Sequence, residues 1–581
     1  MAQEPATKVC SWDSEPHPDI NLWTTGNVEE VVPGVPKPFV ASLFQQVDFD
    51  TSREAVRRWR CDDLLRAQPP PTGNWLGIFA GRGALNLAWF SFVLATFQTG
   101  ESSAALEQYF SSDRSFLFTG ALADRERAAR TRALMMRYVW PRSAASIDPL
   151  NRRVAALRQE VASLDLRSLP SRRLWSLFGR VRALHAHILT THLTISGAAG
   201  EMAGETGRLL AAELGDRFQE AMVAGLTMGL GDVESAQPGF ELWRIGRYVA
   251  ATPRLREDVA RMSAAEILER LRQPPTEEWR ELAARFRRFI DLYGFRGQNE
   301  ADPTVPTWDE DQTFVASVIK TDAAASEDQD PIRRAEEGVA NRKRLEEELA
   351  AMLPRTRRAQ FRLLATRAQF FARTRERSKA CFVRAIRIAR PLILELERRL
   401  AERGVVEKPE DMEFLLFEEV QDIALGRPQD DYRAAVRARR AEWERMHRVL
   451  PPEVFVPPPE VTEIVKAEAT SNVLQGHGVS PGVARGRARV VRSAAAAEET
   501  ELRPGEVLVA PFTDAAWTPL FIPAAAVVVE TGGVLSHAAT VAREYGIPAV
   551  VAVKGATELI PEGALVTVDG AAGTVTIEPE G

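Results

Sequence analysis

One histidine, His537, stands where a glycine turn meets the start of a predicted helix. Thr531, Gly532 and Gly533 form the turn, and Ser536 directly precedes the histidine. Glycines let the backbone turn tightly, and the N–H groups at a helix N-terminus favour a bound dianion. An imidazole near neutral pH is a good nucleophile and a good leaving group. This pattern predicts a histidine that accepts and releases a phosphoryl group, and it is too specific for a core histidine at a helix start.

Two cations, Arg375 and Lys379, form a second candidate site on a predicted helix. Their i, i+4 spacing puts both on one helix face, where like charges repel unless they share an anion. Arginine can clamp two oxygens of a phosphoryl group, and lysine supplies a point charge. By spacing alone, a solvated helix face partly neutralised by Glu376 is the better explanation. The family resemblance described below favours phosphoryl binding instead.

Further motifs surround His537 in a fixed order, at residues 476–482, 505–511, 513–519 and 566–570. Together they resemble the swivelling phosphohistidine domain of enzymes related to phosphoenolpyruvate (PEP) synthase, pyruvate phosphate dikinase and rifampin phosphotransferase. The resemblance covers residues 473–579 and implies that His537 carries a phosphoryl group from one active site to another. Some members have cysteine before the histidine, where this chain has Ser536. That difference favours the antibiotic-kinase branch over the enzymes that form PEP.

Three earlier segments resemble the acceptor-binding domain of rifampin phosphotransferase and occur in the family's order. They are residues 23–34, residues 81–87, and residues 293–302 with 306–308. The resemblance implies that Arg375 and Lys379 face the phosphohistidine during transfer.

The same resemblance makes four polar residues weaker candidates for acceptor binding: Arg82, Arg296, Glu300 and Asp302. Arg296 and Glu300 could equally pair with each other to brace a loop. The acceptor itself is expected to be a bulky apolar or aromatic alcohol, because apolar and aromatic residues are frequent in one N-terminal stretch. These residues could also be core packing; they are Trp75, Phe79, Trp89, Phe90, Phe92 and Phe97.

Three histidines, His185, His187 and His192, lie close together on one predicted helix. The last two are five residues apart, which is not the i, i+4 spacing of a helical metal pair. We therefore predict no metal site. One of them could be a base for the acceptor hydroxyl, although a structural role is the better explanation.

Composition narrows the class of protein. The chain has 581 residues, 45% of them hydrophobic and 27% charged, with a net charge of −6. These values are typical of a globular protein with two to four domains, and they give no reason to expect nucleic-acid binding. Its three cysteines, Cys10, Cys61 and Cys381, form no CxxC pair, so neither a disulfide scaffold nor structural zinc is expected. Without a signal peptide or a long apolar run, we expect a cytoplasmic protein that does not enter the membrane.

The elements that position these sites follow from periodicity. The spacing predicts helices at residues 150–192, 204–229, 276–294, 332–353 and 355–404. Pro354 and Pro391 are expected to break or kink them, and Ser263 with Glu266 has the form of a capping box. Short β-branched runs follow near the C-terminus, and these predict strands at residues 488–491, 507–509, 527–529, 550–553 and 566–568.

We therefore predict a multidomain protein, with a mainly α-helical acceptor-binding region followed by a compact α/β swivelling domain. The helical region takes in residues 1–450, a proline-rich linker residues 451–472, and the phosphohistidine domain residues 473–581. Clustered prolines make a stiff, extended connector without helix.

The family's ATP-binding domain, of the ATP-grasp type, normally precedes the acceptor domain. Here only about twenty residues precede the first acceptor-like segment, too few for such a domain. We therefore expect a separate ATP-grasp subunit that holds ATP and Mg²⁺ and phosphorylates His537, a division like that of phenylphosphate synthase. His537 would then pass the phosphoryl group to a small-molecule hydroxyl. The alternative is a non-catalytic module that binds a small molecule or relays phosphate.

Overall fold

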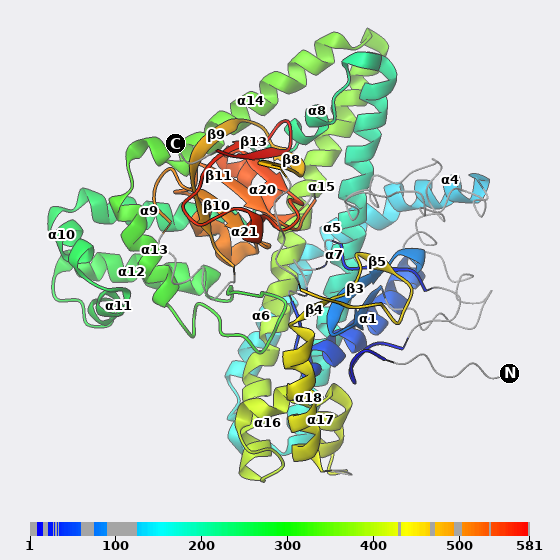
Figure 1. Ribbon diagram of the computed structural model, residues 1–581, viewed down its shortest axis with the longest axis vertical. Helices are drawn as coiled ribbons and strands as arrows, with labels where there is room; N and C mark the ends of the chain where they lie inside the picture. Colours follow the sequence, from blue (N-terminus) through cyan, green and yellow to red (C-terminus); the bar gives the residue numbers. More distant parts are fainter. Residues whose placement is uncertain are drawn as a thin grey trace. The chain divides into compact units, whose positions relative to one another are not determined.

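The structure is a computed structural model of the 581-residue chain. It describes residues 8–15, 21–26, 28, 32, 34–59, 75–89, 125–427, 431–464, 471–492, 502–533 and 536–578. Cys61, Phe90, Phe92 and Phe97 lie outside these residues. The predicted fold class is confirmed, because a mainly helical region is followed by an α/β domain (Figure 1).

The chain folds into two compact units, each assembled from segments that are distant in sequence. Unit 1 contains residues 1–198, 301–304 and 378–465. Unit 2 contains residues 199–300, 305–377 and 466–581. The predicted helical region 1–450 thus contributes to both units, and the phosphohistidine domain shares unit 2 with part of that region.

A small antiparallel sheet in unit 1 has the strand order β2-β3-β1-β5. Its strands are Leu76–Phe79 (β2), Arg82–Asn86 (β3), Trp23–Thr24 (β1) and Val454–Phe455 (β5). Trp23 packs edge-on against Phe79, with ring centroids 4.7 Å apart. Because β5 belongs to the proline-rich segment 451–472, the first part of that segment is a strand of this sheet. The short strands β4 (Val449–Leu450) and β6 (Thr462–Glu463) pair with each other.

Helices make up most of the remaining described residues of unit 1. They include α1 (Pro38–Arg58), α4 (Arg125–Leu134), α5 (Trp140–Ala145), α6 (Ile147–Ala162), α16 (Ala389–Glu402), α17 (Phe417–Ala424) and α18 (Tyr432–Met446). Two long helices, α7 (Ser171–Leu214) and α15 (Arg355–Arg387), contribute residues to both units.

The helical part of unit 2 consists mainly of amphipathic helices whose apolar faces meet. These are α8 (Glu220–Gly225), α9 (Gln237–Ala251), α10 (Pro253–Arg261), α11 (Ala264–Arg272), α12 (Glu277–Tyr293), α13 (Thr313–Ala324) and α14 (Pro331–Met352). One continuous hydrophobic core joins these helices to the α/β domain, because Trp243 and Phe240 belong to the same cluster as Trp517 and Tyr545.

The α/β domain is built on an eight-stranded sheet of order β7-β14-β13-β9-β10-β11-β12-β8. Its central strands β9 (Val483–Val490), β10 (Val507–Ala510), β11 (Ala526–Val529) and β12 (Ala549–Val551) are parallel. The outer strands are β7 (Val473–Gln475), β8 (His477–Ser480), β13 (Leu565–Asp569) and β14 (Thr574–Ile577). The helix α20 (His537–Tyr545) packs against β8, β11 and β12 (Figure 1). β10 and β11 are fully buried, as expected for a sheet covered on both faces.

Most predicted elements are found. Helix α12 is capped at its C-terminus by Gly294, and the capping box of Ser263 and Glu266 opens α11. Pro354 separates α14 from α15. The next helix break is at Ile388, between α15 and α16 and three residues before Pro391. All five predicted strands overlap observed strands.

Two helix predictions needed correction. The predicted helix 150–192 is broken after Ala162, and α7 begins only after Pro170. The predicted helix 204–229 ends at Leu214, where Gly215 adopts a left-handed φ of 56°. In both cases the chain is helical on either side of a local break that the periodicity did not reveal. Among the described residues, no helix is long and apolar enough to cross a membrane.

Asp322 of α13 supplies a test of this packing. Its side chain is 1% exposed, and a β-carbon added at Gly246 of α9 would lie 2.4 Å from Asp322 Cβ. Oδ2 has no hydrogen-bond partner among the described residues. Burial therefore raises the pKa of Asp322 well above its usual range, although Arg247 partly opposes the shift.

We predict that Asp322→Asn increases the free energy of unfolding near neutral pH. The unfolded carboxyl ionises above a pH of about 4, whereas the folded one stays protonated, so the wild type loses stability as pH rises. The advantage of the variant should therefore grow from pH 5 to pH 8, by up to about 1.4 kcal/mol per pH unit. Chemical denaturation at several pH values measures this difference. If Asp322→Asn instead lowers the free energy of unfolding by the same amount at every pH, Asp322 is ionised and paired with Arg247 in the folded protein.

Candidate active site

His537 is the first residue of α20, as predicted, and follows strand β11 by a tight turn. Gly532 in this turn has a φ of 128°, a conformation that strongly favours glycine. The hydroxyl and the N–H of Thr531 both donate to the carbonyl of Pro511, at 3.0 Å. Ser536 is the N-cap, and its Oγ accepts the N–H of Ala539 at 3.2 Å. The loop residues Thr531, Gly532 and Ser536 thus have structural tasks that fix the start of α20.

The imidazole of His537 is held between two threonines. Its Nδ1 lies 3.0 Å from Thr513 Oγ1, and its Nε2 lies 3.2 Å from Thr518 Oγ1. Phe521 approaches the ring edge-on at 5.9 Å, and the His537 side chain is 2% exposed. The segment that carries both threonines is fixed by Asp514, whose Oδ1 accepts the N–H of Ala516 at 2.9 Å.

The face of the α/β domain that contains His537 packs against the helical part of unit 2 through polar bonds to its main chain. Glu544 accepts the N–H groups of Leu230 and Gly231, at 2.8 and 3.0 Å. Tyr545 donates its hydroxyl to the carbonyl of Ala236 at 2.9 Å. Thr518 donates to the carbonyl of Ser235 at 3.2 Å.

A further bond joins Asp514 Oδ2 to the N–H of Asn299 at 2.8 Å. The contact is also tight sterically, since a β-carbon on Gly239 would lie 2.0 Å from the Tyr545 hydroxyl. We call this packed arrangement the docked state of the α/β domain.

Charged groups on α20 are buried by docking. Burial raises the pKa of Glu544, and the N–H groups of Leu230 and Gly231 partly offset that shift. Burial also lowers the pKa of Arg543 to about 10, with a smaller contribution from Arg375 that Glu544 opposes. Arg375 is therefore within electrostatic reach of the helix that carries His537.

The two cations predicted to bind phosphate lie one turn apart on α15, as expected. Arg375 makes an ion pair with Glu376 at 2.6 Å, so part of its charge is neutralised in this state. Arg375 belongs to unit 2 with His537, whereas Lys379 belongs to unit 1.

The four weaker candidates all make local contacts. Arg296 and Glu300 pair with each other at 2.7 Å, with side chains that are 3% and 4% exposed. Arg82 and Asp302 belong to unit 1. Arg82 donates to the carbonyl of Val449 at 3.3 Å, and Asp302 accepts both the N–H and the hydroxyl of Thr304 at 2.8 Å. These contacts brace loops.

The three neighbouring histidines differ in environment. His185 is buried beside Phe382, and burial lowers its pKa to about 3. The Nδ1 of His187 lies 2.6 Å from Glu54, and the Nδ1 of His192 lies 2.8 Å from Ser378. Across the described ranges, no group of three or more His, Cys, Asp or Glu side chains is arranged to hold a metal ion.

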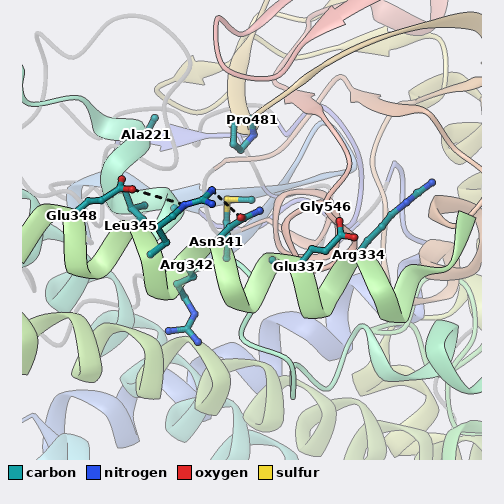
Figure 2. A pocket seen from close by; sticks show the side chains of 13 residues that line it. Ala221, Arg334, Glu337, Asn341, Arg342, Leu345, Glu348, Pro481 and Gly546 are labelled. Atoms are coloured by element: carbon teal, nitrogen blue, oxygen red, sulfur yellow. Dashed lines mark hydrogen bonds and ion pairs between the residues drawn. The ribbon is translucent and has the colours of Figure 1, made fainter. Parts of the chain in front are cut away.

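A pocket of about 400 Å³ lies elsewhere in unit 2, between α8, α14 and the loops at Pro481 and Gly546 (Figure 2). None of the predicted site residues lines it. Its charged groups are engaged locally, since Arg344 donates to Asn341 at 3.0 Å and lies 3.8 Å from Glu348.

Four residues of the site were not predicted individually: Thr513, Thr518, Glu544 and Tyr545. The threonines belong to the motif at residues 513–519, but their contacts with His537 depend on a fold that brings this motif beside α20. Glu544 follows His537 by seven residues and so lies on the same helix face. That spacing was visible in the sequence, but the surface that this face contacts was not.

Two family models match the chain. Residues 191–376 match the rifampicin phosphotransferase fourth domain, and residues 502–573 match the mobile domain of PEP-utilising enzymes. Over part of its length, the chain is similar to rifampicin phosphotransferases. It is 31% identical to the rifampicin phosphotransferase of Streptomyces sviceus over 361 residues, which cover 61% of this chain and 41% of that protein.

Other relatives are similar to shorter parts of the chain. The prodigiosin synthesizing transferase PigC of Serratia marcescens is 33% identical over 56% of this chain and 37% of its own. An uncharacterized protein of Mycobacterium tuberculosis is 44% identical over 35% of this chain and 23% of its own. The chain thus spans between about a quarter and two fifths of the length of these relatives. A solved structure of Enzyme I aligns with 55% of this chain and 82% of its own, with a TM-score of 0.14 and 13% identity.

Docking can be tested at Gly239. We predict that Gly239→Ala lowers the free energy of unfolding by about 1–3 kcal/mol, because its methyl group would overlap the Tyr545 hydroxyl. The variant should also expose His537, which diethyl pyrocarbonate would then modify faster. Gly179→Ala is the matched control, since nothing lies within 4 Å of its β-carbon. Unchanged stability and reactivity in Gly239→Ala would contradict the docked contact.

Proposed function

We propose that this chain is the phosphohistidine carrier and acceptor-binding part of an ATP-dependent phosphotransferase, in which His537 carries the phosphoryl group. One observation carries the proposal. His537 starts a helix after a glycine turn, and hydroxyls hold both of its ring nitrogens, within a region that matches the mobile domain of PEP-utilising enzymes.

The phosphoryl group would come from ATP bound with Mg²⁺ on a separate ATP-grasp subunit. Mg²⁺ would neutralise charge on the nucleotide phosphates there. This chain would supply the nucleophile: a lone pair on a His537 ring nitrogen forms the N–P bond, and a P–O bond to the nucleotide breaks. By the family resemblance, the β-phosphate would be transferred: the bond between the α- and β-phosphates breaks to release AMP, and water cleaves the bond between the β- and γ-phosphates to release phosphate.

The second transfer would go to a hydroxyl of a small apolar or aromatic molecule. Two relatives are named for rifampicin and prodigiosin, which supports an acceptor of this type. Unit 1 holds a cluster of three tryptophans. The ring centroid of Trp75 lies 5.3 Å from that of Trp59 and 4.4 Å from that of Trp89. These rings are buried against one another and would form a wall behind an aromatic acceptor.

Arg375 and Lys379 would stabilise the charge on the phosphoryl group while it moves. Arg375 is already within electrostatic reach of α20, and it would exchange its ion pair with Glu376 for the phosphoryl oxygens. The acceptor oxygen forms a new P–O bond, the N–P bond breaks, and the hydroxyl proton leaves to a base.

We predict that wild-type protein, incubated with ATP, Mg²⁺ and lysate of the source cells, gains an acid-labile mass of about 80 Da. His537→Ala should show no gain while it keeps the wild-type circular dichroism spectrum, because only this residue accepts the phosphoryl group. Intact-protein mass spectrometry measures the gain. If a competent loading protein is shown to be present and no gain appears, the non-catalytic binding or relay module becomes the better description.

Arg375→Met and Lys379→Met should load normally but pass the phosphoryl group on more slowly. Loss of one such contact in a phosphoryl-transfer site costs roughly 10²-fold in rate. The measurement is the decay of labelled phospho-His537 in the presence of an acceptor, with rifampicin as the first probe. Arg377→Met, which changes an exposed arginine on the same helix, is the control. Equal decay in all four proteins would remove these cations from the mechanism.

A further inference from the structure

Glu376 lies on α15 between the two cations that the proposed function assigns to the phosphoryl group, Arg375 and Lys379. Its side chain is 5% exposed and pairs with Arg375 at 2.6 Å, whereas the side chain of Arg375 is 16% exposed. A buried carboxylate loses its hydration, and only neighbouring cations or hydrogen-bond donors can compensate for that loss. The surroundings of Glu376 therefore show which cations share this space.

Two further arginines of unit 2 are within electrostatic reach of Glu376. The pKa of Arg296 is raised although burial opposes the shift, because Glu300 and, to a smaller extent, Glu376 favour its charged form. Burial lowers the pKa of Arg543, and both Glu544 and Glu376 oppose this shift. Together with its ion-pair partner, Glu376 thus has three arginines within electrostatic reach.

This arginine cluster adjoins the site of His537. Arg296 donates to the carbonyl of Glu234 at 3.5 Å, and the next residue, Ser235, accepts the hydroxyl of Thr518. Thr518 in turn contacts a ring nitrogen of His537. Two donors here, Nε of Arg296 and Oγ of Ser235, are buried and have no hydrogen-bond partner among the described residues. Buried donors without a partner favour a bound acceptor, and a phosphoryl group supplies three strong acceptor oxygens.

Arginines beside a phosphohistidine have to distinguish two kinds of phosphate. Free inorganic phosphate has the same oxygens as the phosphoryl group and would occupy the same arginines. A phosphoryl group on His537 is covalently held on the docked domain, so its effective concentration exceeds that of a free ion. A carboxylate that competes for Arg375 weakens the binding of both, but only the tethered group has the effective concentration to displace it.

We propose that Glu376 is a positioning residue that takes the place of the phosphoryl group at Arg375 and so excludes free phosphate. The inference rests on the proposed function and adds selectivity to it. When phospho-His537 arrives, its oxygens replace the carboxylate at Arg375, and no covalent bond is made or broken in this exchange. Glu376 keeps Arg296 and Arg543 within electrostatic reach, so its charge remains compensated.

The first test needs neither ATP nor a partner protein. Glu376→Gln keeps the shape of the side chain but removes its charge, so Arg375 becomes available to a free anion. Equilibrium dialysis with ³²P-labelled inorganic phosphate, at constant ionic strength, measures the dissociation constant. We expect it to fall by about tenfold or more in Glu376→Gln, because a competing charge-assisted bond is lost. The double variant Arg375→Met, Glu376→Gln should lose this gain, and equal affinity in the wild type and Glu376→Gln would overturn the proposal.

Glu300→Gln is the matched control. It removes an equally buried carboxylate from an arginine of the same cluster, but that arginine, Arg296, is 3% exposed, against 16% for Arg375. We therefore expect Glu300→Gln to bind phosphate no more tightly than the wild type does. A gain as large as that of Glu376→Gln would show a general response to lost negative charge and would refute the specific role of Glu376.

A second variant covers the case in which Glu376→Gln does not fold. Glu376→Asp keeps the charge but shortens the side chain by one methylene group, so its contact with Arg375 weakens. Its affinity for inorganic phosphate should rise above that of the wild type, by a smaller factor than a full loss of charge would give. Affinity no higher than that of the wild type would contradict the proposal.

The link to His537 is tested on phosphorylated protein. Potassium phosphoramidate phosphorylates histidine directly: the new N–P bond forms on the ring, the P–N bond of the reagent breaks, and ammonia leaves. Glu376→Gln that carries phospho-His537 should lose its gained affinity for free phosphate, because the tethered group then occupies Arg375. Phosphate binding that is unchanged by phosphorylation would place the two anions at separate sites and would reject the proposal.

Failure of the proposed function would be visible separately, since the binding of inorganic phosphate does not depend on loading from ATP. Tighter phosphate binding in Glu376→Gln, without any ATP-dependent gain in mass on His537, would keep the role of Glu376 as an internal competitor at Arg375 and reject the carrier role. An ATP-dependent gain in mass without a change in phosphate affinity would do the reverse.

Discussion

The carrier role proposed for His537 requires that a donor and an acceptor both reach it, yet His537 is buried here. Its burial comes from the packing of the α/β domain against helices of unit 2, with which it shares one hydrophobic core. The rest of the site depends on this contact. It determines the partners of the threonines beside His537, the environment of Glu544 and Arg543, and the proximity of Arg375 to α20.

The polar part of the contact consists mostly of side chains of the α/β domain bonded to main-chain groups of the helical region. Glu544, Tyr545 and Thr518 bond to N–H or carbonyl groups between Leu230 and Ala236. Such bonds contribute about 1 kcal/mol each, because water replaces them when the surfaces separate. Glu544 opposes docking at the same time, since its carboxylate loses hydration on burial. If the domain leaves and returns, as the proposed function requires, the buried carboxylate of Glu544 would offset part of the apolar contact that holds the two surfaces together.

The residues proposed to carry the phosphoryl group and the residues that bury them come from different segments. His537, the glycine turn and the N-cap come from one short stretch of the α/β domain. The carbonyl of Ser235 comes from the helical region and accepts the hydroxyl of Thr518, which also contacts His537.

The sequence alone determined the parts of this protein that depend on local order. The strand–turn–helix around His537, the helix face shared by Arg375 and Lys379, the capping box at Ser263 and the alternation of strands near the C-terminus all follow from nearest-neighbour chemistry. Arg296 and Glu300 show the limit, since their i, i+4 spacing allowed either a binding site or an ion pair, and the tertiary structure chose the pair.

Only the tertiary structure decided which segments share a unit, why His537 is buried and what each of its nitrogens contacts. Residues 199–300 and 305–377 join the α/β domain, although a proline-rich segment and many helices intervene in the sequence. Long-range contacts of this kind depend on which apolar faces meet, and periodicity reveals that a face exists without revealing its partner. The Thr518 bond to Ser235 is of the same kind, because a main-chain carbonyl carries no sequence signature.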